Sequence, residues 1–180
     1  MLRPFLEDSP IMSHAFDTVQ QFSKMLRNLD QWIDKAVAQA KVRSFDPEVL
    51  VTARLAPDQY PLQRQVQSSC DSAKFAAAYL SGKQAPAHPD TETTVAELRA
   101  RIATVLGYLE TFKAEDFAGA DERKVSPAWM KGKWLRGDHY LNQLSIPNFY
   151  FHVTTAYAIL RHNGVDVGKM DFIGSVPMRD

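Results

Sequence analysis

Cysteine is almost missing from this sequence, since Cys70 is its one example in 180 residues. A single cysteine excludes an internal disulfide and any zinc site built from several thiolates. The same scarcity is typical of proteins from a reducing compartment, so we expect a cytoplasmic protein.

An excess of one charge and a long apolar run are missing as well. Lys and Arg total 21, and Asp and Glu also total 21. Such a balance gives no electrostatic footprint for nucleic acid or for an anionic membrane surface. No apolar run approaches the roughly 20 residues of a membrane-spanning helix. We therefore expect neither a nucleic-acid partner nor a membrane partner.

The common catalytic and nucleotide-binding motifs are also missing. The sequence contains no G-x-x-x-x-G-K-[ST], G-x-G-x-x-G, G-x-S-x-G or H-E-x-x-H string. These absences exclude, at the level of motifs, the usual phosphate loop, dinucleotide fold, serine hydrolase and zinc protease. The polar residues that remain lie on or beside apolar helical stripes.

What is present is the composition of one globular domain. Hydrophobic residues make up 45% of the chain, enough for a sizeable core at this length. Residues 1–11 hold two acidic residues and two prolines without a continuous apolar core, which disfavours a secretory signal. We predict a poorly ordered arm over residues 1–12 and a single helical domain over residues 13–180.

Four segments carry apolar residues at steps of three and four, the period of one buried helical face. They predict helices over residues 13–43, 61–81, 94–113 and 138–163. Residues 114–137 are predicted to form a long irregular crossover, with a short hairpin as one alternative. The sequence thus predicts an all-α, antiparallel four-helix bundle with a long crossover before the last helix.

Local signals mark the ends of several helices. Asp46 followed by Pro47 is typical of a helix cap with proline in the first turn. Thr94 and Glu97 fit a capping box. Pro147 lies inside the last helical segment and predicts a bend or restart there, because proline has no amide hydrogen to donate.

Two sets of polar residues repeat with helical spacing and form the candidate site. Asn148 and His152 lie four residues apart on the last helix, and Gln67 and Asp71 have the same spacing on the second. We expect the four side chains to converge inside the bundle, directly or through water, with Asp71 orienting His152. The alternative is a buried hydrogen-bond network that only fixes helix register.

Three consecutive aromatic residues, Phe149, Tyr150 and Phe151, point three ways around one helix. At least one ring must therefore leave the interior. Either the crossover or a second subunit can cover such a ring, so a homodimer is a further prediction.

The longest distinctive string runs from Pro147 to Val165, PNFYFHVTTAYAILRHNGV, and it is accompanied by RQVQ at residues 64–67 and by Cys70-Asp71. Together they resemble a bacterial family of unknown function grouped with the DinB-like (YfiT-like) four-helix bundles. The resemblance spans about residues 13–174. It implies the DinB-like bundle as the fold.

The resemblance also implies where a metal would lie. DinB-like proteins hold a divalent metal with one histidine of the second helix and an H-x-x-x-H on the last, upstream of a Leu-Arg-x-x-Gly ending. Residues 160–164 supply that ending, which places His152 at one ligand position and Asn148 at the other. Gln67 or Asp71 takes the place on the second helix. One imidazole, one amide and one carboxylate make a weak zinc or nickel site, so we predict no firm metal ligand other than His152.

Two functions from different classes stay open. The first is a DinB-like bundle with a degenerate metal site whose remnant pocket binds a small molecule. The alternative is a metal-dependent enzyme, such as a thiol-dependent transferase or a hydrolase, with His152, Asp71 and Asn148 around an atypical metal. The sequence does not identify a substrate.

Overall fold

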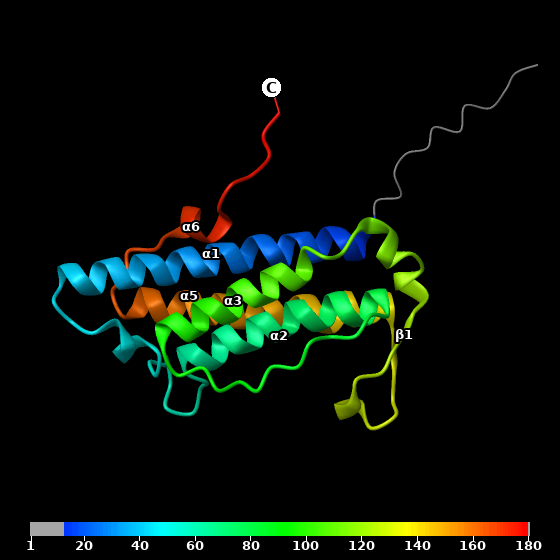
Figure 1. Cartoon of the computed structure of the whole chain (residues 1–180), viewed down its shortest axis with the longest axis horizontal. Helices are drawn as coiled ribbons and strands as arrows, with labels where there is room; N and C mark the ends of the chain where they lie inside the picture. Colours follow the sequence, from blue (N-terminus) through cyan, green and yellow to red (C-terminus); the bar gives the residue numbers. More distant parts are fainter. Residues whose placement is uncertain (1–12, 180) are drawn as a thin grey trace, which may run out of the picture.

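Four long helices form the body of this computed structural model, which describes residues 13–179 (Figure 1). They are α1 (His14–Val42), α2 (Leu62–Ser81), α3 (Val95–Leu109) and α5 (Ile146–His162). The shorter elements are η1 (Pro47–Leu50), η2 (Ala114–Phe117), η3 (Ala120–Glu122), β1 (Lys124–Val125), η4 (Ala128–Met130), β2 (Leu135–Arg136), α4 (Gly137–Tyr140), η5 (Leu141–Ser145) and α6 (Lys169–Ile173). The predicted arm over residues 1–12 lies outside the described residues.

The four predicted helices are confirmed to within about one turn at each end when α4, η5 and α5 are taken together as the last one, and their apolar stripes form the core. Phe22, Val66, Ile102 and Phe149, one from each long helix, are all buried. The Phe22 and Phe149 rings stack with centroids 4.0 Å apart. One shared core therefore holds the long helices together.

The predicted caps are also confirmed. Asp46 accepts a hydrogen bond from the backbone N–H of Glu48 at 3.0 Å, with Pro47 in the first turn of η1. Thr94 and Glu97 form a reciprocal capping box at the start of α3. These signals act over three residues, which is why sequence alone locates them.

The last helix begins before its proline and changes pitch there, as predicted. Gly137–Tyr140 forms α4, Leu141–Ser145 forms one π-helical segment, and α5 follows with Pro147 in its first turn. Pro147 has no amide hydrogen to donate to the preceding turn, and the helix widens to a π turn in that preceding segment.

The directions of the helices differ from the antiparallel prediction. α2 and α3 run parallel, because Arg64 near the start of α2 pairs with Asp90 just before α3, whereas Lys83 just past α2 pairs with Asp116 just past α3. The chain must return along the full length of α2, and residues 83–94 form this strap (Figure 1). Twelve extended residues reach about 40 Å, more than the roughly 30 Å of a 20-residue helix, so the strap is long enough.

α5 runs parallel to α1 and antiparallel to α2. Contacts between α1 and α5 advance together along both helices, from Phe22–Phe149 to Trp32–Tyr157. The contacts between α2 and α5 run in opposite senses, from Gln65–His152 through Ser72–Asn148 to Tyr79–Tyr140. This last pairing determines which polar side chains meet.

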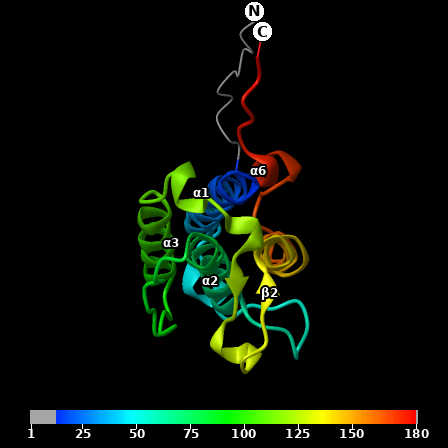
Figure 2. The same ribbon diagram turned by 90° about the vertical axis from the view of Figure 1, so that its right-hand side faces the viewer.

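The predicted connection before the last helix crosses one end of the helices, from α3 on one side to α5 on the other (Figure 2). It includes the short antiparallel hairpin of β1 and β2, which the sequence analysis gave as an alternative. Gly137, where α4 begins, touches this connection so closely that a Cβ would lie 1.8 Å from the carbonyl oxygen of Ala120. Only glycine fits there.

No helix among residues 13–179 combines the length and the apolar character needed to cross a membrane.

Candidate functional site

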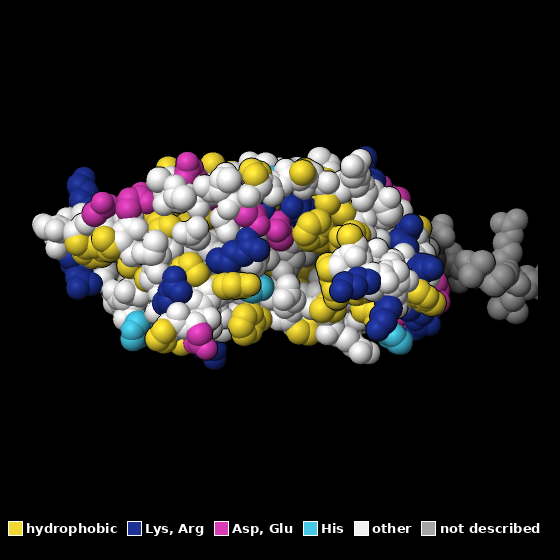
Figure 3. Space-filling model, turned by 90° about the horizontal axis from the view of Figure 1, so that it is seen from below, with side chains coloured by type: hydrophobic (Ala, Val, Ile, Leu, Met, Phe, Trp, Pro, Cys, Tyr) yellow, Lys and Arg dark blue, Asp and Glu magenta, His cyan; other side chains and the backbone are white. Residues whose placement is uncertain are grey.

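A cavity of about 600 Å³ lies between α2, the π segment with α5, and the hairpin residue Trp129. Three of the four predicted site residues, Asp71, Asn148 and His152, line it, whereas Gln67 does not. The hairpin end of this face mixes basic and hydrophobic side chains (Figure 3). The cavity is therefore the candidate site.

His152 is fixed in orientation by a relay of two hydrogen bonds. The side-chain Nε2 of Gln65 donates to the carbonyl oxygen of Tyr60 at 3.1 Å, which leaves Gln65 Oε1 as an acceptor. His152 Nδ1 lies 2.8 Å from that oxygen, so Nδ1 must carry a hydrogen and donate it. The other ring nitrogen, Nε2, is then an unprotonated acceptor left for the cavity.

Burial also keeps His152 neutral. Its side chain is only 9% exposed. Loss of solvation lowers the pKa of His152 below the ordinary value of 6.5, and the positive charge of Arg64 lowers this pKa further. At neutral pH the imidazole is therefore an uncharged acceptor rather than a cation.

Asn148 is oriented in a comparable way. Ser72 donates its hydroxyl hydrogen to the carbonyl oxygen of Ser68 at 2.7 Å. Ser72 Oγ can then only accept from Asn148 Nδ2, which lies 2.7 Å away. The amide oxygen of Asn148 is therefore a second acceptor without a recorded partner among the described residues. The buried hydroxyl of Ser145, in the same wall, has no partner there either.

Asp71 belongs to a network of charged side chains on the other flank of α2. Its Oδ1 lies 2.7 Å from Lys74 Nζ and 2.6 Å from an Arg101 Nη atom. The Lys74 and Arg101 side chains are 2% and 1% exposed. Both cation contacts go to Oδ1, so Oδ2 is the carboxylate oxygen that remains for the cavity.

The strap completes this network. Arg101 also contacts Glu92 at 2.9 Å and Asp90 at 3.1 Å. Asp90 has a positive φ of 55°, a conformation that strains a non-glycine residue and that these ion pairs hold in place. Gln67 donates to Glu92 at 2.9 Å, so it serves the network and not the cavity. With Arg64, which pairs with Asp90, the network contains three cations and three anions. The cations are Arg64, Lys74 and Arg101, and the anions are Asp71, Asp90 and Glu92.

The network changes the pKa of several members. Burial raises the pKa of each of the Asp90 and Glu92 carboxyls, but their hydrogen bonds with arginine and other donors outweigh burial and lower both. His88 accepts from Lys74 at 3.0 Å, and burial followed by the Arg101 and Lys74 charges lowers its pKa. Burial raises the pKa of Cys70 to about 12, so it is an inert thiol at neutral pH.

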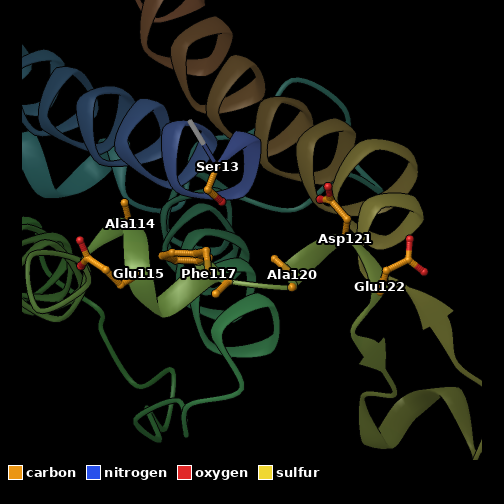
Figure 4. Close-up of a pocket in the computed structure, with 9 residues that line it drawn as sticks. Ser13, Ala114, Glu115, Phe117, Ala120, Asp121 and Glu122 are labelled. Atoms are coloured by element: carbon orange, nitrogen blue, oxygen red, sulfur yellow. The ribbon is translucent and has the colours of Figure 1, made fainter. Parts of the chain in front are cut away.

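A second cavity, of about 710 Å³, lies beside Ser13 and the connection after α3. Its polar side chains do not converge, because Glu115 and Glu122 lie at opposite ends of the lining with Phe117 and Ala120 between them (Figure 4). It therefore lacks a focused set of functional groups.

The family model for a domain of unknown function, DUF1993, matches residues 16–173. The chain belongs to the DUF1993 family. A crystal structure of a DinB family member protein from Shewanella denitrificans is 52% identical to it, covering 92% of this chain and 94% of that one, with a TM-score of 0.88. DUF1993 is therefore a DinB-like family, and the resemblance noted in the sequence is confirmed. No curated protein matches the chain.

The cavity of this DUF1993 chain does not fit a divalent metal. Across residues 13–179, no group of three or more His, Cys, Asp or Glu side chains is arranged to hold one. The donors at the position are one imidazole, His152, one amide, Asn148, and a carboxylate, Asp71, already engaged by two cations. Zinc and nickel favour several nitrogen or sulfur ligands, so this donor set disagrees with the site implied by the resemblance.

The sequence analysis of this DUF1993 chain missed the partners of its own candidates. It proposed Asp71 as the group that orients His152, but the recorded partner is Gln65. The available signal was the spacing of Gln65 and Ser72, seven residues apart on one face of α2. Arg101 and Glu92 were missed because nothing local links them to Asp71.

Proposed function

We propose that this chain is a DinB-like four-helix bundle in which the position of a metal site has become a metal-free polar cavity that binds a small molecule. The observation that carries the proposal is the state of His152. Its Nδ1 hydrogen is committed to Gln65, its pKa is lowered by burial, and its Nε2 is left as an acceptor in a cavity of about 600 Å³. Known ligand pockets span roughly 300–1,000 Å³.

The surroundings of His152 favour binding over catalysis. A histidine acts as a general base when a hydroxyl, thiol or water lies within hydrogen-bond reach. Within the described part of the chain, the recorded partner of His152 is an amide oxygen and not a nucleophile. Ser72, whose hydroxyl lies in the cavity wall, donates its hydrogen to the backbone carbonyl of Ser68.

Ligand-observed NMR tests the proposal with a set of cationic, anionic and neutral aromatic fragments. We expect saturation transfer to some of them in the parent protein and its loss in Ser68→Trp, which fills the cavity. Thr104→Trp, on the exposed side of α3, is the matched control and should keep it. Equal transfer in both variants would contradict the proposal.

Metal analysis separates this function from the metal-dependent enzyme. Protein purified without chelator or affinity tag is measured for zinc, nickel, iron and manganese, beside His152→Ala. We expect no stoichiometric metal in either. A stoichiometric metal that disappears in His152→Ala would favour the enzyme.

We further propose a cytoplasmic homodimer. The fully buried Cys70 thiol is consistent with a reducing compartment, and Phe151 is the ring of the aromatic triplet that leaves the core, with 57% exposure. Light scattering tests this proposal, and a monomer mass at every protein concentration would contradict the dimer.

A further inference from the structure

The chemistry of the cavity changes along its length. Because α2 and α5 are antiparallel there, Ser68 lies at the same end as His152, and Tyr79 lies opposite Tyr140 at the other. One end therefore presents polar groups, and the other presents aromatic rings.

The polar end presents hydrogen-bond acceptors. His152 offers Nε2, because Nδ1 donates to Gln65. Asn148 offers its amide oxygen, because its nitrogen donates to Ser72. Asp71 offers Oδ2, because both of its cation contacts go to Oδ1. A matching ligand must bring hydrogens to donate.

Asp71 is the one ionised side chain among the residues that line this cavity. Lys74 and Arg101 neutralise it at 2.7 and 2.6 Å, within a network that has as many cations as anions. Hydrogen bonding therefore sets the preference at this end: a group that donates several hydrogens matches the acceptors, and a carboxylate, which donates none, is disfavoured.

The aromatic end presents flat surfaces. The Phe75 and Tyr79 rings stack with centroids 5.5 Å apart and planes within 8°, and Tyr140 meets Tyr79 edge-on at 5.7 Å. Trp129 of η4 borders the cavity while 65% exposed, so a ring bound against it would bury it further. Aromatic ligand rings pack well against such surfaces.

We infer that the cavity binds a small aromatic amine, with its ring among Phe75, Tyr79 and Trp129 and its ammonium at the end lined by Asp71, Asn148 and His152. This inference rests on the proposed function and adds the ligand class. An ammonium group supplies three donors and a positive charge, which match the acceptors and the carboxylate.

Three probes with one ring and one two-carbon arm test the inference. They are 2-phenylethylammonium, 3-phenylpropionate and neutral 2-phenylethanol, titrated by calorimetry and by Trp129 fluorescence, with Trp129→Phe as the control for the optical signal. We expect the amine to bind at least about tenfold more tightly than the carboxylate, because only the amine brings hydrogens to the acceptors of His152, Asn148 and Asp71, whereas a carboxylate would leave them unpaired.

Two variants move the charge without relying on Asp71, whose replacement disturbs the ion network. Asn148→Asp adds a carboxylate to the cavity and should tighten the amine and weaken the carboxylate, each by about threefold or more. Gln143→Glu adds the same charge at an exposed site that does not line the cavity, and should change neither.

The outcomes separate the ligand class from the proposed function. If the carboxylate or the alcohol binds as tightly as the amine, or if Asn148→Asp does not favour the amine, the ammonium assignment is wrong while small-molecule binding stands. If none of the three probes binds at millimolar concentration, the ligand class is overturned. The fragment NMR experiment then tests the proposed function separately, since it asks whether any small molecule binds in the cavity.

Discussion

The two flanks of α2 use polar side chains in opposite ways. Toward α3 and the strap, Asp71, Lys74 and Arg101 are charged, and their ionised groups are paired with one another or with Asp90 and Glu92. Toward α5, the side chains are neutral, and His152 and Asn148 each keep one acceptor without a partner among the described residues. The charged network is held by ion pairs within itself, although Asp90 Oδ1 and Arg101 Nε have no hydrogen-bond partner among residues 13–179, and we interpret it as structural. The free acceptors that face the cavity can still bind a ligand. We therefore assign the charged flank of α2 to stability and the flank toward α5 to ligand binding.

The largest expected loss of stability comes from a substitution in the charged flank. Arg101→Met should lower the free energy of unfolding by about 3 kcal/mol, the low end for breaking a buried ion pair, because Arg101 is buried while its carboxylates are 15–26% exposed. The matched control is Arg99→Met, two residues away on α3, whose side chain is 38% exposed and pairs with Asp30 and Asp34. It should cost roughly 0–1 kcal/mol by urea denaturation. Similar small losses in both would show that the network does not hold the strap.

The second-largest expected loss of stability comes from a substitution in the flank toward α5. Gln65→Leu removes the acceptor of His152 Nδ1 and should cost about 1–3 kcal/mol, since a buried donor is left unpaired. Gln63→Leu, on the same turn of α2 but only partly buried, is the control. Nitrogen NMR of the imidazole should show His152 losing its fixed Nδ1–H tautomer in Gln65→Leu alone. An unchanged tautomer would contradict the relay from Tyr60.

The next prediction concerns the pH dependence of stability, in which His152 reports on the flank toward α5 and His88, bonded to Lys74, reports on the charged flank. His152 and His88 have folded pKa values below the ordinary 6.5, so the folded state binds fewer protons than the unfolded state. Their contribution is present above pH 6.5 and is lost as pH falls toward the lowered values. The lowered pKa values of Asp90 and Glu92 place the loss of the stability that these two carboxylates contribute in a more acidic window, below the ordinary 3.8 and 4.5.

Denaturation curves between about pH 7.5 and about pH 5.5 test this assignment, in the range where histidines titrate. His152→Gln should lose less stability across that range than the parent does, and its loss below about pH 4.5 should be unchanged. A parent protein whose stability rises as the pH falls through this range would contradict both histidine assignments.

The smallest effect concerns Asn148, which lies at the exposed edge of the cavity and has one recorded bond, to Ser72. Asn148→Ala should cost only about 0.5–1.5 kcal/mol, the net value of a single hydrogen bond near solvent. Thermal denaturation of Asn148→Ala and Gln65→Leu, measured under the same conditions, shows which variant loses more stability. A loss in Asn148→Ala as large as that in Gln65→Leu would mean that the edge of the cavity also holds the fold.

Three of the four predicted residues of the candidate site line the cavity. His152 and Asn148 were recognised because they share a helical face, and Asp71 lines the cavity with them. Gln67 has the same spacing to Asp71 but turns toward Glu92 of the strap. Nothing local distinguishes Gln67 from Gln65, since both are buried glutamines on one turn of α2. Their roles depend on which neighbouring segment each one faces.

The sequence by itself determined the helices, their caps and the break at Pro147, because amphipathic period, capping and proline geometry act over a few residues. It also identified the DinB-like family. Tertiary structure alone decided that α2 and α3 run parallel, that the strap carries the anions for Arg101, and that Gln65 holds His152 across 87 positions of chain. The physical reason is that a buried polar side chain takes its partner from whichever helix packs against it, and that packing is a property of the whole core.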